Sequence, residues 1–445
     1  MNLHFGFELG GGRRESVARF VWMCGSIPSE EEQALKRLVA VVLAIALVCV
    51  PVAMGATASS SALEKRIADT PYQIWPAKAR SNSPDFVRAA IKQRNAQGDN
   101  CKVVLGTSEF RWVYPDTVSS HPGNFFANNN YGMDTFLLGQ PYCQDLWHAI
   151  EVGALSEDIP DDKVVFFCGI SWFMDYQNPA KCFRLSFSPE AYADLMANPK
   201  VSDETKAKIQ KKMVEYGVSE DDVYAEASDK TFVDRINEGV QKIFDTSKNW
   251  DAVLSDEEDD WNAPERELNK SRPVPEGRTQ GEAQVPDWDA WMSQEQAEGA
   301  DQTSSNDMGI YNSWYENGGY DKWYAGREDW LTFTDEPYQE TEFEDFELFL
   351  DVCQETGVQP LVVLMPLKGT MVDQTDYTAD VRAIWYDRMK TICEERGVEY
   401  VDYSPYEYDP YFLYDMAHFG WTGWVQVNHD IYEFFMGKDE ADEAN

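Results

Sequence analysis

A serine directly after an apolar run is the first residue of this sequence whose position suits covalent chemistry. Residues 102–106 read KVVLG, which predicts a buried strand, and Thr107, Ser108 and Glu109 follow it. A hydroxyl at a strand end is exposed to substrate while the sheet holds its backbone rigidly. The N–H groups of the turn could also bind a developing oxyanion. The same turn would serve equally well as the N-cap of a following helix, so this motif does not establish a function by itself.

An aspartate and a histidine near the C-terminus could supply the other two members of a serine triad. Asp415 stands three residues before His418, and the chain has only five histidines. At this spacing on a turn or helix start both side chains project to one side, so the carboxylate can accept from Nδ1–H and leave Nε2 to take the serine proton. A buried structural histidine beside an acid is the alternative. His121 and His429 look incidental, whereas His148 follows an apolar run and could lie behind the site.

The composition excludes several classes of function. The 445 residues carry a formal net charge of −40 and an isoelectric point near 4.3, which argues against nucleic acid, because phosphate contacts need lysine and arginine. The eight cysteines form no CxxC or CxH pair, so a structural zinc site is not expected. One disulfide, Cys353 to Cys393 for example, is possible if the domain lies outside the cell, but the sequence does not show which cysteines pair.

An apolar segment near the N-terminus predicts a membrane anchor. Residues 38–56 read LVAVVLAIALVCVPVAMGA without a charge, which is long enough for a helix to span a bilayer. The basic pair at 36–37 favours a cytoplasmic N-terminus, and the basic pair at 65–66 weakens that bias. The small-x-small sequence at 56–58 would suit cleavage of a signal peptide instead. The long uncharged core favours an uncleaved, single-pass anchor in the cell membrane, with the catalytic domain outside the cell.

Short apolar runs alternate with amphipathic stretches along the rest of the chain. The runs predict buried parallel strands at 102–106, 135–139, 163–169, 360–365 and 397–401. Helical periodicity is found at 189–197, 202–216, 231–244, 341–356 and 379–396, the last of these stopped by Gly397. This alternation predicts an α/β three-layer domain with a parallel sheet, flanking helices and a site at the carboxyl ends of the strands.

Changes in composition divide the chain into segments. We expect a cytoplasmic tail at 1–37, the transmembrane anchor at 38–56, a membrane-proximal segment at 57–99, the catalytic domain at 100–436 and an acidic tail at 437–445. Within the domain, residues 255–306 contain SDEEDD, RPVPEG and a polar run with few aliphatic residues. Such a segment cannot bury enough apolar surface to order itself, which predicts a disordered or loosely packed insertion that is dispensable for activity.

Five blocks of sequence occur in a recognisable order. GTSEF at 106–110 lies within the first block, at 100–130, and DMAHFGWTGWVQV at 415–427 is the last. Between them come FLLGQPYCQDLWH at 136–148, KVVFFCGISWF at 163–173 and GVQPLVVLMPLKGTMVDQTDY at 357–377. Together these blocks resemble the DltD family, the D-alanine transfer proteins of lipoteichoic acid D-alanylation, which form a distant branch of the SGNH hydrolases. The resemblance runs from the anchor to the C-terminus apart from the acidic insertion.

The resemblance implies a three-layer SGNH or flavodoxin-like fold and a serine acyltransferase. Ser108, Asp415 and His418 match the family's triad, and Gly139 matches its oxyanion glycine. It further implies that a DltB-like membrane acyltransferase partner delivers D-alanyl groups across the membrane. Ser108 would then pass them to lipoteichoic acid, with no cofactor.

Two residues near the predicted triad raise questions of their own. Lys368 stands where the family usually has asparagine. It would replace a neutral oxyanion donor by a cationic one, unless its side chain points to solvent. Glu109, beside the nucleophile, could accept the ammonium group of a D-alanyl donor, or it could be a surface or capping carboxylate. The family also usually shows Pro-Gln where this chain has Ile170-Ser171, which concerns the contacts with the acceptor.

The charge of the chain conflicts with the charge of the implied acceptor. A polyanionic acceptor would be repelled at long range by a protein of net charge −40, so its approach must be locally less acidic or screened by cations. Two other functions stay open at this point. The domain could be an esterase or thioesterase that uses water as acceptor, or a non-catalytic scaffold that gathers the D-alanylation machinery.

Overall fold

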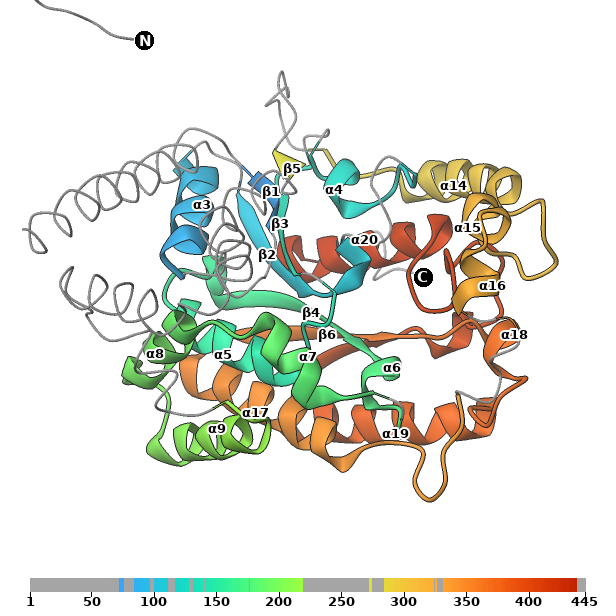
Figure 1. Ribbon diagram of the computed structural model, residues 1–445. Helices are drawn as coiled ribbons and strands as arrows, with labels where there is room; N and C mark the ends of the chain where they lie inside the picture. Colours follow the sequence, from blue (N-terminus) through green and yellow to red (C-terminus); the bar gives the residue numbers. More distant parts are fainter. Residues whose placement is uncertain are drawn as a thin grey trace, which may run out of the picture. The chain divides into compact units, whose positions relative to one another are not determined.

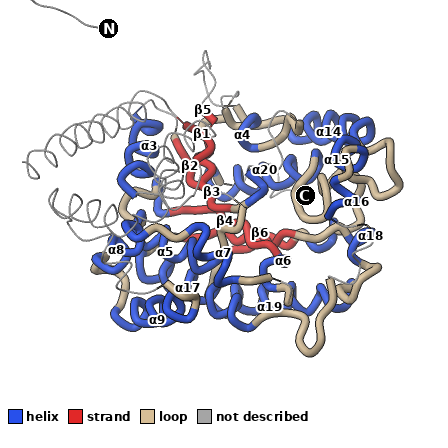
Figure 2. Tube along the Cα trace, in the orientation of Figure 1, coloured by secondary structure: helices blue, strands red, loops and turns tan. Residues whose placement is uncertain are grey.

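The computed structural model describes eleven stretches of the chain, and all structural statements below concern these residues. They are residues 72–75, 84–96, 100–110, 117–127, 131–139, 141–175, 177–218, 272–273, 284–323, 325 and 331–437. All of them belong to one compact unit, Ala62–Asn445. Figure 1 shows its helices and strands in chain order, and Figure 2 shows the same trace by type of element.

Seven strands form one sheet at the centre of the described residues. They are β1 (Tyr72–Trp75), β2 (Cys101–Gly106), β3 (Asp134–Gly139), β4 (Lys163–Gly169), β5 (Arg272–Pro273), β6 (Gln359–Met365) and β7 (Glu399–Asp402). Their order is β5-β1-β3-β2-β4-β6-β7, and every neighbouring pair is parallel except β1 with β5. The five strands β3-β2-β4-β6-β7 have the flavodoxin-like order, in which the chain switches direction between β2 and β4.

Helices cover both faces of the sheet and make three layers (Figure 1). On one face lie α3 (Pro84–Ala96), α5 (Asp145–Leu155), α7 (Pro179–Ser186), α8 (Pro189–Ala197), α9 (Asp203–Glu215), α17 (Glu340–Thr356) and α19 (Ala379–Arg396). On the other lie α4 (Pro122–Phe125), α14 (Trp288–Gln302) and α20 (Trp421–Met436). Shorter helices complete the fold: α6 (Ile170–Phe173), α15 (Asn312–Glu316), α16 (Gly319–Trp323) and α18 (Gly369–Val372).

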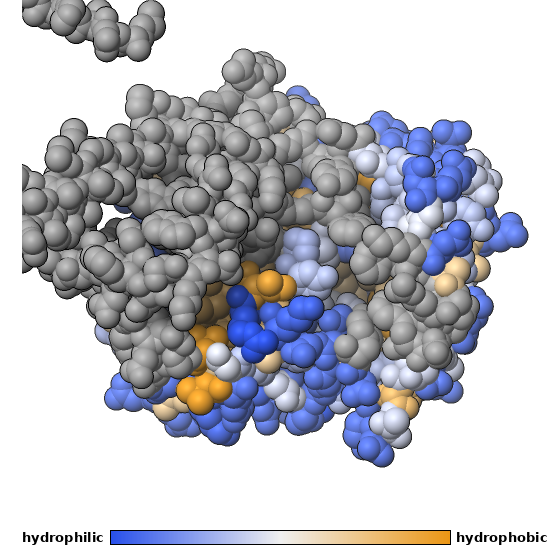
Figure 3. All heavy atoms as spheres, in the orientation of Figure 1, coloured by the Kyte–Doolittle hydropathy of each residue, from blue (hydrophilic) through white to orange (hydrophobic). Residues whose placement is uncertain are grey.

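Each face of the sheet has its own hydrophobic core. Side chains alternate along a strand, so Val103 and Leu105 of β2 pack into one core and Val104 packs into the other. The outer surface is largely hydrophilic where Figure 3 shows described residues, as the acidic composition leads one to expect.

The predicted alternation of strands and helices is confirmed. The five predicted strands correspond to β2, β3, β4, β6 and β7, each within two residues of the predicted bounds. The predicted helices at 189–197 and 379–396 are α8 and α19, and those at 202–216 and 341–356 are α9 and α17. α19 ends at Gly397, whose φ of 65° is the left-handed conformation that glycine adopts without strain. The predicted helix at 231–244 lies outside the described residues.

The prediction of a loosely packed acidic insertion is wrong for residues 284–306. Here the chain forms α14, which packs along α20. Trp288 stacks on Phe125 of α4 at 5.4 Å, and Trp291 lies 5.0 Å from the same ring. The carboxylate of Glu295 is buried and accepts a hydrogen bond from Ser120 at 2.9 Å. The segment has few aliphatic residues, but its tryptophans supply the apolar contact that packs this part of the insertion against the domain.

Several predictions fall outside the described part of the chain. These are the anchor at 38–56, the tail at 1–37, much of the segment at 57–99, and residues 438–445. None of the helices that the structure describes has the length and apolar character needed to cross a bilayer. Cys353 and Cys393 are both buried with free thiols, so the bridge considered from sequence is not formed.

Candidate active site

The serine and the acid–base pair come from segments more than 300 residues apart in the chain. Ser108 begins a 3₁₀ turn directly after β2, at the carboxyl end of the parallel sheet. Asp415 and His418 lie on a short loop before α20, closed by the antiparallel pairing of Leu413 with Phe419. Ligands of open α/β sheets bind at this edge, near the point where the strand order reverses.

The three side chains are linked in the order serine, histidine, aspartate. Ser108 Oγ lies 2.8 Å from His418 Nε2. On the other side of the ring, His418 Nδ1 lies 2.9 Å and 2.8 Å from the two carboxylate oxygens of Asp415. Asp415 Oδ1 also accepts the N–H groups of Ala417 at 2.9 Å and His418 at 3.0 Å, which holds the carboxylate in place. In this geometry the imidazole can take the serine proton while the aspartate orients its ring.

Electrostatics favour an ionised aspartate and a basic histidine. Burial by itself would raise the pKa of Asp415, but the charge of His418 and the hydrogen bonds from His418 and Ala417 lower it below its ordinary value. Burial would lower the pKa of His418, but the charge and hydrogen bond of Asp415 raise it, with a further contribution from Glu109. The imidazolium formed during proton transfer is therefore stabilised by its neighbours.

Gly139 lies at the end of the strand next to the nucleophile's strand. It pairs with Gly106 across β2 and β3, and a Cβ on Gly139 would overlap the carbonyl oxygen of Gly106. Only glycine allows the two strand ends to approach this closely. The loop after β3 is also tied to the serine turn, because the N–H of Tyr142 donates to Thr107 Oγ1 at 3.1 Å. The structure thus places Gly139 beside the turn that carries Ser108.

Lys368 lies against the acid–base loop. Its side chain is buried, which excludes the solvent-facing alternative. The N–H of Lys368 donates to the carbonyl oxygen of Met416 at 2.8 Å and so connects this loop to that of Asp415 and His418. Burial lowers the pKa of Lys368 to about 8, and the charge of Asp415 acts in the opposite direction. The charge of Asp415 thus partly offsets the effect of burial on Lys368.

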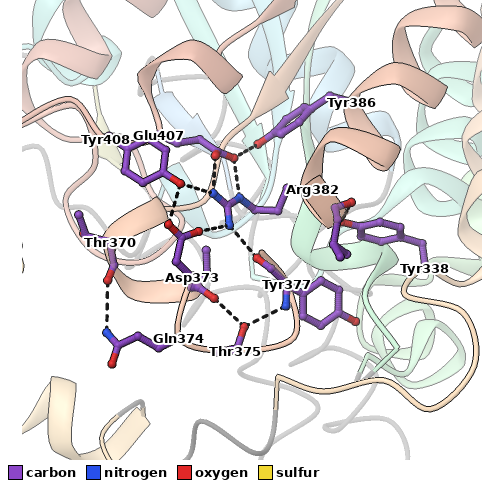
Figure 4. Close-up of polar contacts among 12 residues, drawn as sticks. Tyr338, Thr370, Asp373, Gln374, Thr375, Tyr377, Arg382, Tyr386, Glu407 and Tyr408 are labelled. Atoms are coloured by element: carbon purple, nitrogen blue, oxygen red, sulfur yellow. Dashed lines mark hydrogen bonds and ion pairs between the residues drawn. The ribbon is translucent and has the colours of Figure 1, made fainter. Parts of the chain in front are cut away.

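A buried arginine that the sequence did not single out holds the loop of Lys368 (Figure 4). Arg382 of α19 is fully buried and donates from Nε and Nη2 to the carboxylate of Glu407 at 2.8 and 2.6 Å. Its Nη1 donates to Asp373 at 2.8 Å and to the carbonyl oxygen of Tyr377 at 2.7 Å. Figure 4 shows these groups converging on one guanidinium. The only sequence signal for this role is that Arg382 interrupts the apolar face of a predicted helix.

Glu109 is fully buried rather than exposed, and its carboxylate turns back under the serine turn. Its Oε1 accepts the N–H of Thr107 at 2.6 Å. Burial raises the pKa of Glu109 to about 7, against the opposing effect of its hydrogen bonds with backbone N–H groups and of the charge of His418. The surface alternative for Glu109 is wrong, and no exposed carboxylate atom remains for a donor ammonium. The capping alternative agrees with the contact to Thr107.

Two other histidines of the described residues, His121 and His148, have structural surroundings. His121 is buried, accepts the N–H of Gly123 at 3.0 Å and so caps α4. His148 lies on α5, buried and 3.0 Å from Glu151, with its ring against Phe166. That core is on the face of the sheet opposite to α20, so His148 does not lie behind the triad as the sequence suggested.

Comparison with known proteins identifies the family of this chain. The family model described as "DltD protein" matches residues 78–436. The chain is 26% identical over 322 residues to Protein DltD of Bacillus subtilis (strain 168), covering 71% of this chain and 78% of that protein. It is 20% identical to Protein DltD of Lacticaseibacillus rhamnosus over 411 residues, 89% of each chain. Protein DltD of Staphylococcus aureus (strain NCTC 8325 / PS 47) is also 20% identical, over 72% of this chain and 78% of that protein. Since the family model covers strands β2 to β7, the serine turn and the acid–base loop, the chain belongs to the DltD family.

Proposed function

We propose that this protein is a serine acyltransferase that transfers D-alanyl groups to lipoteichoic acid outside the cell. The observation that carries the proposal is the continuous contact from Ser108 Oγ through His418 to Asp415, with 2.8 Å between the serine oxygen and the imidazole. Membership of the DltD family supplies the substrate class, because the family name stands for D-alanine transfer in teichoic acid D-alanylation.

In the first half-reaction Ser108 becomes acylated. The serine oxygen attacks the carbonyl carbon of the D-alanyl donor while His418 Nε2 takes the hydroxyl proton. The tetrahedral intermediate carries its negative charge on the former carbonyl oxygen, which the N–H groups of Ser108 and Gly139 would bind. Collapse breaks the bond to the donor's leaving group, which departs with the proton from His418, and leaves a D-alanyl ester on Ser108.

In the second half-reaction a hydroxyl group of the polyol acceptor attacks the acyl-enzyme. His418 removes its proton, the acceptor oxygen bonds to the acyl carbon, and the Ser108 ester bond breaks as the serine oxygen regains a proton from His418. The result is a D-alanyl ester on lipoteichoic acid and a free enzyme. Asp415 keeps the imidazole in the tautomer that both steps need.

Lys368 gives the site a cationic group where the resemblance leads one to expect a neutral amide. Buried near Asp415, its ammonium would add to the backbone donors for the oxyanion, and it would favour a phosphate of the acceptor near the triad. This local positive charge would partly offset the repulsion between a polyanionic acceptor and a protein of net charge −40.

The remaining parts of the proposal concern placement in the cell. We propose that residues 38–56 anchor the protein in the cell membrane, with the domain at 100–436 outside. A DltB-like membrane acyltransferase partner would supply the donor from within the bilayer. Residues 57–99 would connect the anchor to the domain and so keep the domain near the membrane surface.

Substitution of Ser108 by alanine tests the acyl-enzyme. In cells that produce only the Ser108→Ala protein, we expect the D-alanine ester content of the cell envelope to fall to the level of a deletion strain, because no nucleophile remains. Ester release at mild alkaline pH followed by quantification of D-alanine measures this. Ser119→Ala, which removes another half-buried hydroxyl outside the triad, serves as the matched control. Unchanged ester content in Ser108→Ala cells with normal protein levels would rule out the mechanism.

A reconstituted membrane separates transfer from hydrolysis. The triad could pass its acyl group to water as well as to a polyol, so an esterase or thioesterase would release free D-alanine without acylated lipoteichoic acid. If the protein were a scaffold without catalytic activity, a serine-directed fluorophosphonate would not label Ser108 in the folded protein. We expect labelling of Ser108 and acylation of lipoteichoic acid.

A further inference from the structure

The carboxylate of Glu109 lies within the turn that presents the nucleophile. Its Oε1 accepts the N–H of Thr107 at 2.6 Å, and its own backbone N–H also contributes a hydrogen bond to it. Of the three consecutive N–H groups in the turn, the carboxylate thus engages those on either side of Ser108. Neither of these hydrogen bonds uses the N–H of Ser108, the group that the proposed mechanism assigns to the oxyanion.

The surroundings of Glu109 are shaped for a carboxylate. A Cβ on Gly106 would overlap Glu109 Oε1, so the absence of a side chain at Gly106 makes the space that the carboxylate occupies. Oε2 is buried and has no hydrogen-bond partner among the described residues. An incompletely paired buried carboxylate costs stability, and a packed apolar side chain would avoid that cost. A buried acid in such a place points to a use for its charge.

The charge of Glu109 acts on His418. The two groups interact electrostatically in both directions, since His418 favours the ionised form of Glu109 and Glu109 favours the protonated form of His418. The other titratable groups around the turn are Asp415 on the loop of His418, Lys368 before α18, and His121 before α4. Among these, Asp415 orients the ring through Nδ1, whereas Glu109 approaches from the side of the nucleophile.

We propose that Glu109 is a positioning residue with two effects on the reaction, an inference that rests on the proposed serine chemistry. Its hydrogen bonds hold the turn so that Ser108 Oγ faces His418 Nε2. Its negative charge makes His418 a stronger base and stabilises the imidazolium that forms when the serine proton is transferred. This role replaces the expected contact with the donor's ammonium group, for which the buried carboxylate has no exposed atom.

The rate at which a fluorophosphonate labels Ser108 in the full-length protein, followed from about pH 5 to pH 9, tests the proposal. Glu109→Gln keeps an oxygen acceptor for Thr107 but removes the charge. Because the pKa of Glu109 is raised to about 7, its charge is only partly present in the range where His418 titrates, so we expect the acid limb of the profile to move down by less than about one pH unit. The maximal rate should fall by up to about tenfold because the base is weaker. Glu109→Ala, which also loses the hydrogen bond, should label more slowly still.

Controls separate this role from a structural one. Glu151→Gln makes the same change at another buried carboxylate, beside His148 and away from the triad, and should leave the pH profile unchanged. A slower rate in Glu109→Gln at every pH with an unmoved acid limb would reduce Glu109 to a packing role and overturn the electrostatic part. Unaltered labelling would overturn the whole proposal. Absence of labelling in the unsubstituted protein would instead contradict the proposed function. If Glu109→Gln weakened binding of a D-alanyl donor but left labelling unchanged, the result would contradict the positioning role and support a contact between Glu109 and the donor's ammonium group.

Discussion

At the scale of single residues, the burial of Lys368 is the feature with the clearest chemical consequence. An ammonium group withdrawn from water beside a triad carries its charge at a cost, and this cost appears as a pKa lowered to about 8. Lys368 is therefore protonated at neutral pH but loses its charge within the range in which enzymes are assayed. A neutral asparagine at this position would not titrate at all.

If Lys368 assists the oxyanion, activity should decline as the pH rises through about 8. The sign follows from the direction of the shift, because the charged and useful form exists below the pKa. Lys368→Met should lower the plateau rate, by about 10²–10³-fold if the contact is as strong as one oxyanion donor, and Lys368→Asn should keep more activity without the alkaline limb. Rates of D-alanyl transfer or of Ser108 labelling against pH measure this. Lys102→Met, at the far end of β2, should retain the alkaline limb.

At the scale of secondary-structure elements, the network around Arg382 connects the start of α19 to two loops at the active edge. Arg382 pairs with Glu407 in the loop after β7 and with Asp373 at the end of α18, the helix that begins next to Lys368. In addition, the N–H of Gly369 donates to the carbonyl oxygen of Glu407 at 2.9 Å. The segment that follows Lys368 is thus held on one side by the Arg382 network, while the N–H of Lys368 itself bonds to Met416 on the acid–base loop.

Arg382→Met should therefore lower both stability and catalysis. Removal of the guanidinium leaves the buried carboxylate of Glu407 without its cationic partner, and breaking a buried ion pair typically costs about 3–5 kcal/mol. Urea unfolding measures the stability. A matched change at a more exposed position of α19, Arg388→Met, removes an ion pair with Glu340 of α17 and should cost about 1 kcal/mol or less. Equal destabilisation by the two substitutions would contradict a special role for the network.

At the scale of the whole molecule, a group of buried acids lies between α5 and α17, on the face of the sheet away from the triad. Asp145, Glu342 and Asp345 are almost wholly buried. Burial raises the pKa of Glu342 well above its ordinary value of 4.5, and the charges of Asp145 and Asp345 raise it further. A carboxyl group whose pKa is raised on folding stabilises the native state fully below its unfolded pKa and progressively less as the pH rises towards its folded pKa.

Glu342→Gln should consequently make the protein more stable at alkaline pH and have little effect near pH 4. The amide cannot ionise, so the penalty that grows with pH in the parent protein is removed, on the order of 1 kcal/mol. Thermal unfolding at a series of pH values measures this. Glu340→Gln, two residues away on the exposed first turn of α17, should show no such gain. A constant difference between Glu342→Gln and the parent protein at all pH values would mean that Glu342 does not titrate in this range.

The sequence alone predicted the features that depend on local patterns. Apolar runs bounded by glycine marked the strands, helical periodicity marked the helices, and the spacing of Asp415 and His418 identified an acid–base pair. Local patterns are informative because strand burial, helix amphipathicity and short-range side-chain geometry are all set by neighbours in the chain. The five blocks also indicated the family, because their order is a property of the linear chain and does not depend on how the chain folds.

Only the tertiary structure decided the features that depend on contacts between distant segments. The burial of Glu109 requires the space at Gly106, and the pairing of Arg382 with Glu407 joins residues 25 positions apart. The tryptophans of α14 pack against the Phe125 ring of α4. A charged residue reads as a surface residue in a linear sequence, because its partner and its loss of water are properties of the folded chain. The triad candidates could thus be named from the sequence, whereas the charges that surround them depend on which distant residues the fold brings together.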